Sequence, residues 1–240
     1  MSVGGAGVDP RNRGACMSSF VNQLRALAKN FSRRAEPIDP KLFGDELAER
    51  TAWTPAVRGG TNIGTHVLKM VPPHRLVFAG TWGATLFTGI FIVIGLAVMG
   101  GALGIATAGG GMATEDLVGA IFFGLTFSGA GFFMRNHLCS RRTFDRQLGV
   151  FWRGRRLPAG VGTRMATDDH VRLETIHALQ IIKEYCSTKN GGYYSYELNL
   201  IRKDASRVNV LDHGKVARLR RDADALAQFL GGIPVWDGSR

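Results

Sequence analysis

A long apolar stretch in the middle of the chain constrains this sequence more than any other feature. Residues 76–134 carry no lysine, arginine or histidine, and their only charged residues are Glu115 and Asp116. A membrane-spanning helix needs roughly 20 apolar residues, because about 30 Å of hydrocarbon is crossed at 1.5 Å per residue. The stretch therefore predicts a transmembrane hairpin over residues 79–134, with spans at about 81–103 and 117–134.

The basic residues of the chain lie on either side of this stretch. Among 240 residues are 30 Lys and Arg against 19 Asp and Glu, and every basic residue lies outside residues 76–134. Cytoplasmic segments next to membrane helices are enriched in Lys and Arg. We therefore expect both termini in the cytoplasm and the connection at Glu115 and Asp116 on the opposite side of the membrane.

The flanks of the hairpin divide into a tail and β-rich segments. Residues 1–42 are Gly-rich and then basic, and we expect a partly disordered tail there, followed by cytoplasmic strands over residues 43–78. Residues 135–240 contain segments of alternating polar and apolar side chains, such as 194–200, which are typical of half-buried strands. Near their end, residues 215–230 show the spacing of an amphipathic helix.

These elements predict an α+β membrane protein, in which a two-helix transmembrane hairpin carries a small antiparallel β-sheet or partial barrel capped by one C-terminal helix. This is the element order of a pleckstrin-homology-like domain. Strands on both sides of the hairpin could complete one sheet, which would avoid an unpaired edge that invites aggregation, but the sequence leaves this question open. Asp212 is placed to cap the C-terminal helix, and Val235 and Trp236 to form a final apolar anchor.

Short motifs flank the hairpin on both sides. In chain order they are Phe43-Gly44-Asp45, Thr51-Ala52-Trp53-Thr54-Pro55, Arg58-Gly59-Gly60-Thr61-Asn62, Thr65-His66, Tyr194-Ser195-Tyr196-Glu197-Leu198-Asn199-Leu200, Arg207-Val208-Asn209-Val210, Asp212-His213-Gly214 and Ile233-Pro234-Val235-Trp236-Asp237. Over about residues 43–237 the chain resembles an uncharacterised family of bacterial two-span membrane proteins. The resemblance implies a location in the bacterial inner membrane, without an assigned activity.

An arginine cluster that begins at the end of the second span is the main candidate site. Seven arginines fall within 22 residues: Arg135, Arg141, Arg142, Arg146, Arg153, Arg155 and Arg156. Anionic lipid attracts each such residue near the membrane surface by about 1 kcal/mol. The cluster therefore predicts contact with lipid headgroups. The alternative is that these charges only fix the topology of the hairpin.

Small residues recur at close spacing in both spans. The candidates for helix packing, within the hairpin or between copies of the chain, are Gly89, Gly100, Gly104, Ala120, Gly124 and Ser128. Small side chains at four-residue spacing allow helix backbones to approach closely in a membrane.

The sequence gives little support to catalytic, metal or transport chemistry. The six histidines include no HExxH motif and no pair at helical i, i+4 spacing, and no CxxC is present, so we expect no metal and no cofactor. Asp212-His213 lacks the serine or cysteine elbow of a hydrolase. Neither span carries an ionisable residue, which disfavours a pump or proton-coupled transporter.

We therefore expect a non-enzymatic membrane protein whose cytoplasmic module engages anionic lipid headgroups, a protein partner or further copies of the chain. An enzyme or accessory factor of envelope metabolism, using the histidines, is the second hypothesis. A channel or transporter subunit is the third. Nucleic acid binding is not expected, because the membrane already supplies phosphates to the basic residues.

Overall fold

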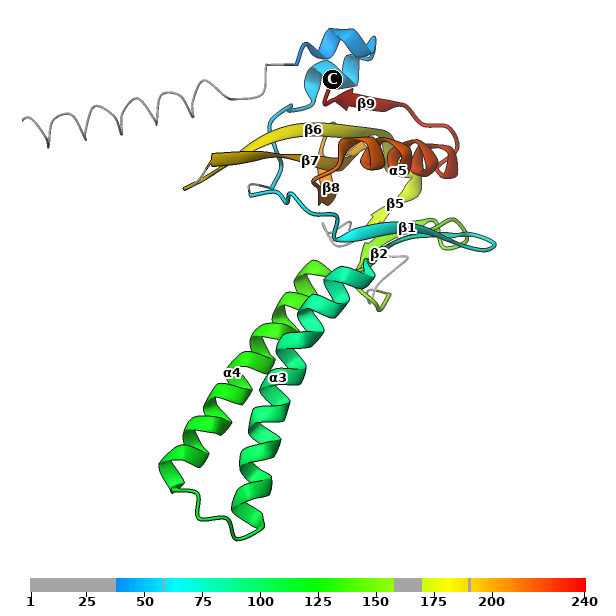
Figure 1. The fold of residues 1–240 in the computed structure, drawn as a ribbon. Coiled ribbons are helices and arrows are strands. Elements are labelled where there is room, and N and C mark those ends of the chain that lie inside the picture. The colour runs from blue at the N-terminus through cyan, green and yellow to red at the C-terminus, as the bar shows by residue number, and fades with distance from the viewer. Residues whose placement is uncertain (1–37, 58, 158–169, 190) are drawn as a thin grey trace, which may run out of the picture.

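The computed structural model describes residues 38–57, 59–157, 170–189 and 191–240. A long pair of helices projects from an α+β domain, whose strands and shorter helices lie together at the other end of the molecule (Figure 1). The expected tail falls almost entirely on residues 1–37, outside the described residues.

The projecting helices, called the helical pair below, are α3 (Trp82–Thr107) and α4 (Thr114–Leu138). With 26 and 25 residues, each is about 38 Å long at 1.5 Å per residue. Thr81 caps α3, because its Oγ1 accepts a hydrogen bond from the backbone N–H of Ala84 at 3.3 Å. α3 extends beyond its predicted span at its C-terminal end, and α4 extends at both ends, where the polar residues Glu115 and Arg135 lie within the helix.

Five antiparallel strands form the first sheet, next to the helical pair, in the order β1-β2-β3-β4-β5. The strands are β1 (His66–Val71), β2 (Arg75–Gly80), β3 (Arg142–Asp145), β4 (Val150–Arg153) and β5 (His170–Arg172). Since α3 follows β2 and α4 precedes β3, and β2 pairs with β3, the helical pair is an insertion between two neighbouring strands. Strands from both flanks therefore share one sheet, which the sequence had left open.

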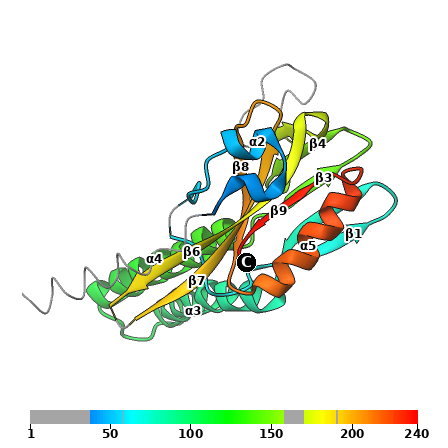
Figure 2. The same cartoon turned by 90° about the horizontal axis from the view of Figure 1, so that it is seen from above.

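A second sheet lies farther from the helical pair, in the order β8-β7-β6-β9. The long strands β6 (Ile176–Thr188) and β7 (Gly191–Arg202) are antiparallel, β8 (Arg207–His213) pairs with β7, and β9 (Val235–Gly238) runs parallel to β6. The 3-10 turn η2 (Leu173–Thr175) connects β5 to β6. Figure 2 shows α5 (Val216–Phe229) beside β9, and this helix contacts β6, β7 and β9.

Two apolar cores stabilise the domain. The larger core joins the two sheets and α5 through fully buried side chains, among them Leu76, Phe144, Leu198, Leu219 and Leu226. The smaller core lies on the outer face of the second sheet, beneath the turn η1 (Pro40–Phe43) and the short helix α2 (Glu46–Arg50). There Trp236 packs near Phe43 and Trp53, whose rings stack with centroids 4.9 Å apart.

The structure corrects the predicted outline of the domain in three places. Strand structure in residues 43–78 begins only at His66, because the preceding residues form α2 and an irregular segment. Asp212 lies in β8 and does not cap α5, which follows Lys215 without a side-chain cap. The final apolar segment is strand β9, so α5 is not the last element. The described strands form two sheets and no closed barrel, and a pleckstrin-homology-like order is therefore not supported.

Candidate functional site

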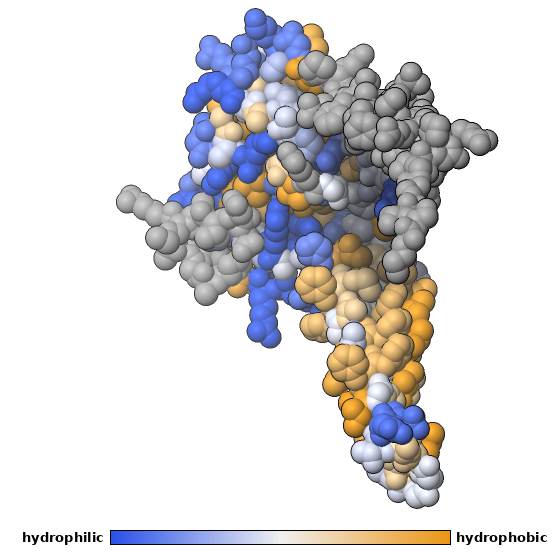
Figure 3. Space-filling view, turned by 90° about the vertical axis from the view of Figure 1, so that its left-hand side faces the viewer, coloured by the Kyte–Doolittle hydropathy of each residue, from blue (hydrophilic) through white to orange (hydrophobic). Residues whose placement is uncertain are grey.

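The surface of the helical pair is apolar along its length. Both helices are long and apolar enough to cross a membrane, and only 17% and 11% of their most apolar parts are buried. Large exposed side chains occur on both helices, including Trp82, Leu86, Phe87, Val93, Phe122, Phe132 and Phe133. Figure 3 shows this apolar surface, with hydrophilic side chains at the far end of the pair. A core helix of a soluble domain is mostly buried, so these helices do not fit that description.

Glycines bring the backbones of α3 and α4 close together, and the rings of Phe91 and Phe127 also meet across the contact with centroids 5.0 Å apart. A Cβ on Gly95 would lie 2.6 Å from the carbonyl oxygen of Gly124, so neither helix has room for a side chain at this point. Ser128 donates a hydrogen bond across the contact to the carbonyl oxygen of Ile92 at 3.3 Å. Such close backbone approach is typical of helices that associate in membranes.

The six predicted packing residues are divided between two sides of the helical pair. Gly124 and Ser128 lie in the α3–α4 contact, and Ala120 is half-buried. The other three lie on the outer side of α3, where a Cβ would meet nothing within 4 Å: Gly89, Gly100 and Gly104. The prediction missed the side of α3 that faces α4, although its buried residues repeat every seven positions: Thr88, Gly95 and Ala102.

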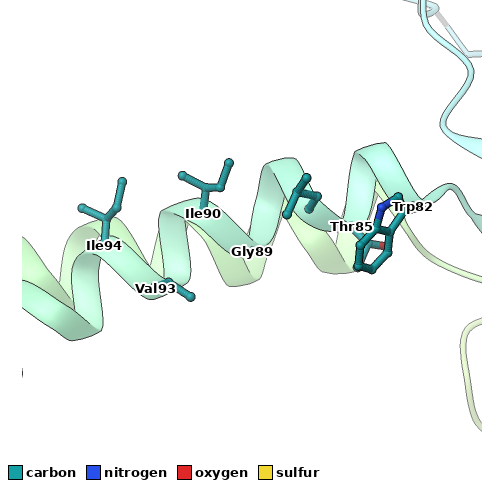
Figure 4. Close-up of a pocket in the computed structure, with 7 residues that line it drawn as sticks. Trp82, Thr85, Gly89, Ile90, Val93 and Ile94 are labelled. Atoms are coloured by element: carbon teal, nitrogen blue, oxygen red, sulfur yellow. The ribbon is translucent and has the colours of Figure 1, made fainter.

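A shallow groove lies on the outer side of α3, where Gly89 has no side chain. It has a volume of about 350 Å³ and is lined by one helix: Trp82, Thr85, Leu86, Gly89, Ile90, Val93 and Ile94 (Figure 4). The exposed lining is apolar. The groove therefore offers space for an apolar chain, without a polar group that would select one ligand.

Four arginines, called the basic collar below, lie at the base of the helical pair: Arg135, Arg141, Arg155 and Arg156. The backbone N–H of Gly154 donates to the carbonyl oxygen of Arg141 at 2.7 Å, which places the segment after β4 beside the segment after α4. Within the described part of the chain, no hydrogen bond or ion pair engages the four guanidinium groups. Their charges are thus available to an external anion.

The other three arginines of the predicted lipid site are engaged within the domain. Arg142 lies opposite Phe78, and Arg153 lies opposite Arg142, so both are on the core side of the first sheet. Both donate hydrogen bonds to backbone carbonyls of β8. Arg146 donates to the carbonyl oxygen of Phe229, and its guanidinium carbon lies 4.5 Å from the centre of that ring. Sequence spacing alone did not distinguish these arginines from the basic collar.

His66 is buried where the first sheet meets the base of the helical pair. Its Nε2 lies 2.7 Å from Arg142 Nη1 and 2.8 Å from the carbonyl oxygen of Ser140, and its Nδ1 lies 2.8 Å from Thr65 Oγ1. Burial and the charge of Arg142 lower the pKa of His66 to about 4. Burial and the nearby Arg153 lower the pKa of Arg142 to about 10. His66 is therefore a neutral group that fixes this junction.

An irregular segment, called the strap below (residues 52–57 and 59–64), crosses the outer face of the second sheet. Glu197 is 1% exposed and accepts hydrogen bonds from the backbone N–H groups of Ala56 at 3.0 Å and Val57 at 3.2 Å. Three further side chains of the sheet donate to carbonyl groups of the strap: Gln180, Tyr193 and Arg207. The strap thus forms hydrogen bonds between its backbone groups and side chains of the sheet, whereas the backbone groups of a strand pair with those of a neighbouring strand.

Asp212 lies directly opposite Glu197, on the neighbouring strand of the second sheet. Burial and then repulsion by Glu197 raise the pKa of Asp212 to about 6. Ser195 Oγ and His213 Nε2 are buried in the same region and have no hydrogen-bond partner within the described residues. Burial raises the pKa of the Cys186 thiol, which disfavours a thiolate nucleophile.

The histidines do not assemble a metal or catalytic centre in the described residues. No group of three or more His, Cys, Asp or Glu side chains there could hold a metal ion. His177 Nε2 lies 2.7 Å from the Asp45 carboxylate, which joins β6 to the start of α2. His213 accepts a hydrogen bond from the backbone N–H of Lys215 at 2.8 Å. These contacts connect elements of the fold and leave the basic collar as the better candidate site.

Comparison of the chain with protein-family models, curated proteins and solved structures found no match. The function is therefore argued from the geometry of the helical pair and the basic collar. These two features meet at one end of α3 and α4, where apolar surface changes to free positive charge.

Proposed function

We propose that this protein is a non-enzymatic, two-span protein of a bacterial inner membrane whose cytoplasmic domain binds anionic lipid headgroups through the basic collar. In this proposal α3 and α4 cross the bilayer as a hairpin, and both termini remain in the cytoplasm. The resemblance of the flanking motifs to bacterial two-span proteins supports the choice of membrane.

The observation that carries the proposal is the separation of charge along the helical pair. Glu115 and Asp116 lie in the first turn of α4, at the end remote from the domain, whereas Arg135 lies in its last turn beside the rest of the basic collar. Basic residues favour the cytoplasmic side of a membrane. Acidic residues in the first turn also interact favourably with the helix dipole, as does a cation in the last turn.

Trp82 supports the same placement of the bilayer. Its side chain is 79% exposed at the first position of α3, next to the domain. Tryptophan is enriched at the boundary between hydrocarbon and headgroups, because its ring is apolar and its N–H is polar. We therefore place this boundary near Trp82, at the end of α3 next to the domain.

Electron spin resonance of spin-labelled lipids tests the lipid contact on the full-length protein in vesicles. Wild type should retain phosphatidylglycerol at its surface in preference to phosphatidylcholine, and high salt should weaken this preference. The variant Arg141→Gln, Arg155→Gln, Arg156→Gln should lose the preference several-fold, as each cation contributes about 1 kcal/mol near the surface.

A matched control removes three exposed charges elsewhere: Lys189→Gln, Lys203→Gln, Arg221→Gln. It should retain the preference of the wild type. An unchanged preference in the collar variant contradicts headgroup binding by the collar. Extraction of wild-type protein from membranes by alkaline carbonate contradicts membrane crossing itself.

A further inference from the structure

The turn between β1 and β2 exposes apolar side chains at one end of the first sheet. Met70 is 58% exposed and Val71 44% exposed, and Pro72 and Pro73 follow them in the exposed turn. Lys69 and Arg75 flank this apolar segment, and both are exposed. Residues 69–75 are called the sheet tip below. Apolar side chains flanked by cations are typical of segments that enter the surface of an anionic membrane.

One face of β1 and β2 is turned away from the domain core. Leu76 and Phe78 point into the core, so the alternate residues of β2, Arg75 and Val77, point to the opposite side. Their partners on β1 are Val71 and Lys69. Figure 1 shows β1 and β2 between the helical pair and the second sheet, extending sideways from the start of α3. This face is therefore the one turned toward the helical pair.

We propose that the sheet tip is a second membrane contact, in which Val71 enters the headgroup region and Lys69 meets lipid phosphates. The inference rests on the proposed function, because it requires α3 to be inserted in the bilayer. Arg75 contributes less charge than Lys69, since its Nε lies 2.5 Å from the carboxylate of Asp145.

The covalent connection to α3 favours a bilayer over a protein as the occupant of this surface. β2 has six residues and continues through Thr81 into α3, so the sheet tip lies within about 20 Å of the start of the span at 3.3 Å per residue. A lipid surface is always present at this distance, whereas a partner protein must be recruited. Anionic lipid also complements the cations of the sheet tip and of the neighbouring collar.

Depth-dependent fluorescence quenching tests the contact in the full-length protein. A genetically encoded, environment-sensitive fluorescent amino acid replaces Val71, and the protein is reconstituted in phosphatidylglycerol vesicles that contain lipids with a nitroxide at the headgroup. Quenching at Val71 should exceed by at least threefold the quenching of the same probe at Lys203, an exposed turn residue between β7 and β8. Lys69→Glu should reduce the quenching at Val71 at least twofold. Equal quenching at Val71 and Lys203 overturns the inference.

A third probe position separates this inference from the proposal on which it rests. At Ile94, an exposed residue in the interior of α3, the probe should be quenched by lipids with a nitroxide deep in the acyl chain. Quenching at Ile94 without quenching at Val71 removes only the membrane contact of the sheet tip. Absence of quenching at Ile94 removes membrane insertion of α3, and the sheet tip contact with it.

Discussion

The helical pair and the domain achieve close packing in opposite ways. In the contact between α3 and α4, Gly95 and Gly124 contribute no side-chain atoms, and the two backbones almost touch. In the domain, by contrast, Arg142 and Glu197 are held inside the structure and bond to backbone groups of other segments. In a membrane, helices associate through close packing, because lipid is as apolar as they are. In a domain surrounded by water, a buried charge persists only where hydrogen bonds replace its hydration.

The largest loss of stability is expected on substitution of Gly95. Gly95→Leu should separate the helices, because even a Cβ would lie 2.3 Å from Ser128 Oγ and 2.6 Å from the carbonyl oxygen of Gly124. We expect a loss of about 3 kcal/mol in the free energy of unfolding in detergent, measured by thermal or denaturant unfolding. Gly101→Leu is the matched control, since a Cβ on Gly101 meets nothing within 4 Å. Equal losses in the two variants contradict the packing role of glycine.

A smaller loss is expected when the charged contact of the strap is weakened. Glu197→Gln retains the shape of the side chain but replaces a carboxylate that accepts from two backbone N–H groups. The cost should be about 2 kcal/mol, since hydrogen bonds to charged groups contribute more than neutral ones. Hydrogen exchange should become faster at the amides of Ala56 and Val57. Glu174→Gln, at a side chain that is 67% exposed, should change neither stability nor exchange.

The buried ionisable groups also give the domain a pH dependence. Between pH 4 and 6 the folded Asp212 retains a proton that the unfolded residue loses, because its pKa is raised from 3.8 to about 6, so its contribution to stability falls as pH rises. The contribution of His66 to stability changes with pH in the opposite direction. Between pH 6.5 and 4 the unfolded residue gains a proton that the folded residue, with its pKa of about 4, does not. The contribution of His66 therefore rises with pH over the same window.

Variants of these two residues separate the opposing contributions. From pH 4 to pH 7, Asp212→Asn should gain about 2 kcal/mol relative to wild type, a value reduced from the full shift for partial exposure. Over the same range His66→Gln should lose the rise in stability that the wild-type histidine provides. Unfolding midpoints in detergent at several pH values measure both slopes. Parallel pH profiles for the three proteins are incompatible with these assignments.

The helical pair and the domain also differ in how far the sequence could predict them. The helical pair was predictable, because absence of charge over two long segments is a local property that only an apolar surrounding explains. The strap was not, since it has no periodic pattern and its hydrogen bonds come from side chains such as Glu197, about 140 residues away. Arg142 and Arg153 were assigned to lipid because a count of arginines does not show which side of a strand each one occupies. The strand register decides this, because it places Arg142 opposite the buried Phe78 and Arg153 opposite Arg142.

Arg153 and Arg155 provide the smallest and most selective test, as they are only two residues apart. Arg153 donates to the carbonyl oxygen of Asn209, so Arg153→Gln should reduce stability by about 1 kcal/mol and leave the lipid preference unchanged. Arg155 is exposed and unpaired within the described residues, so Arg155→Gln should change stability by less than about 0.5 kcal/mol. The preference of the Arg155→Gln protein for phosphatidylglycerol, measured with spin-labelled lipid on the same samples, should fall below that of the wild type. A larger loss of lipid preference in Arg153→Gln than in Arg155→Gln would contradict the assignment of Arg155 to the basic collar. Arg153, and not Arg155, would then be the arginine that contacts lipid.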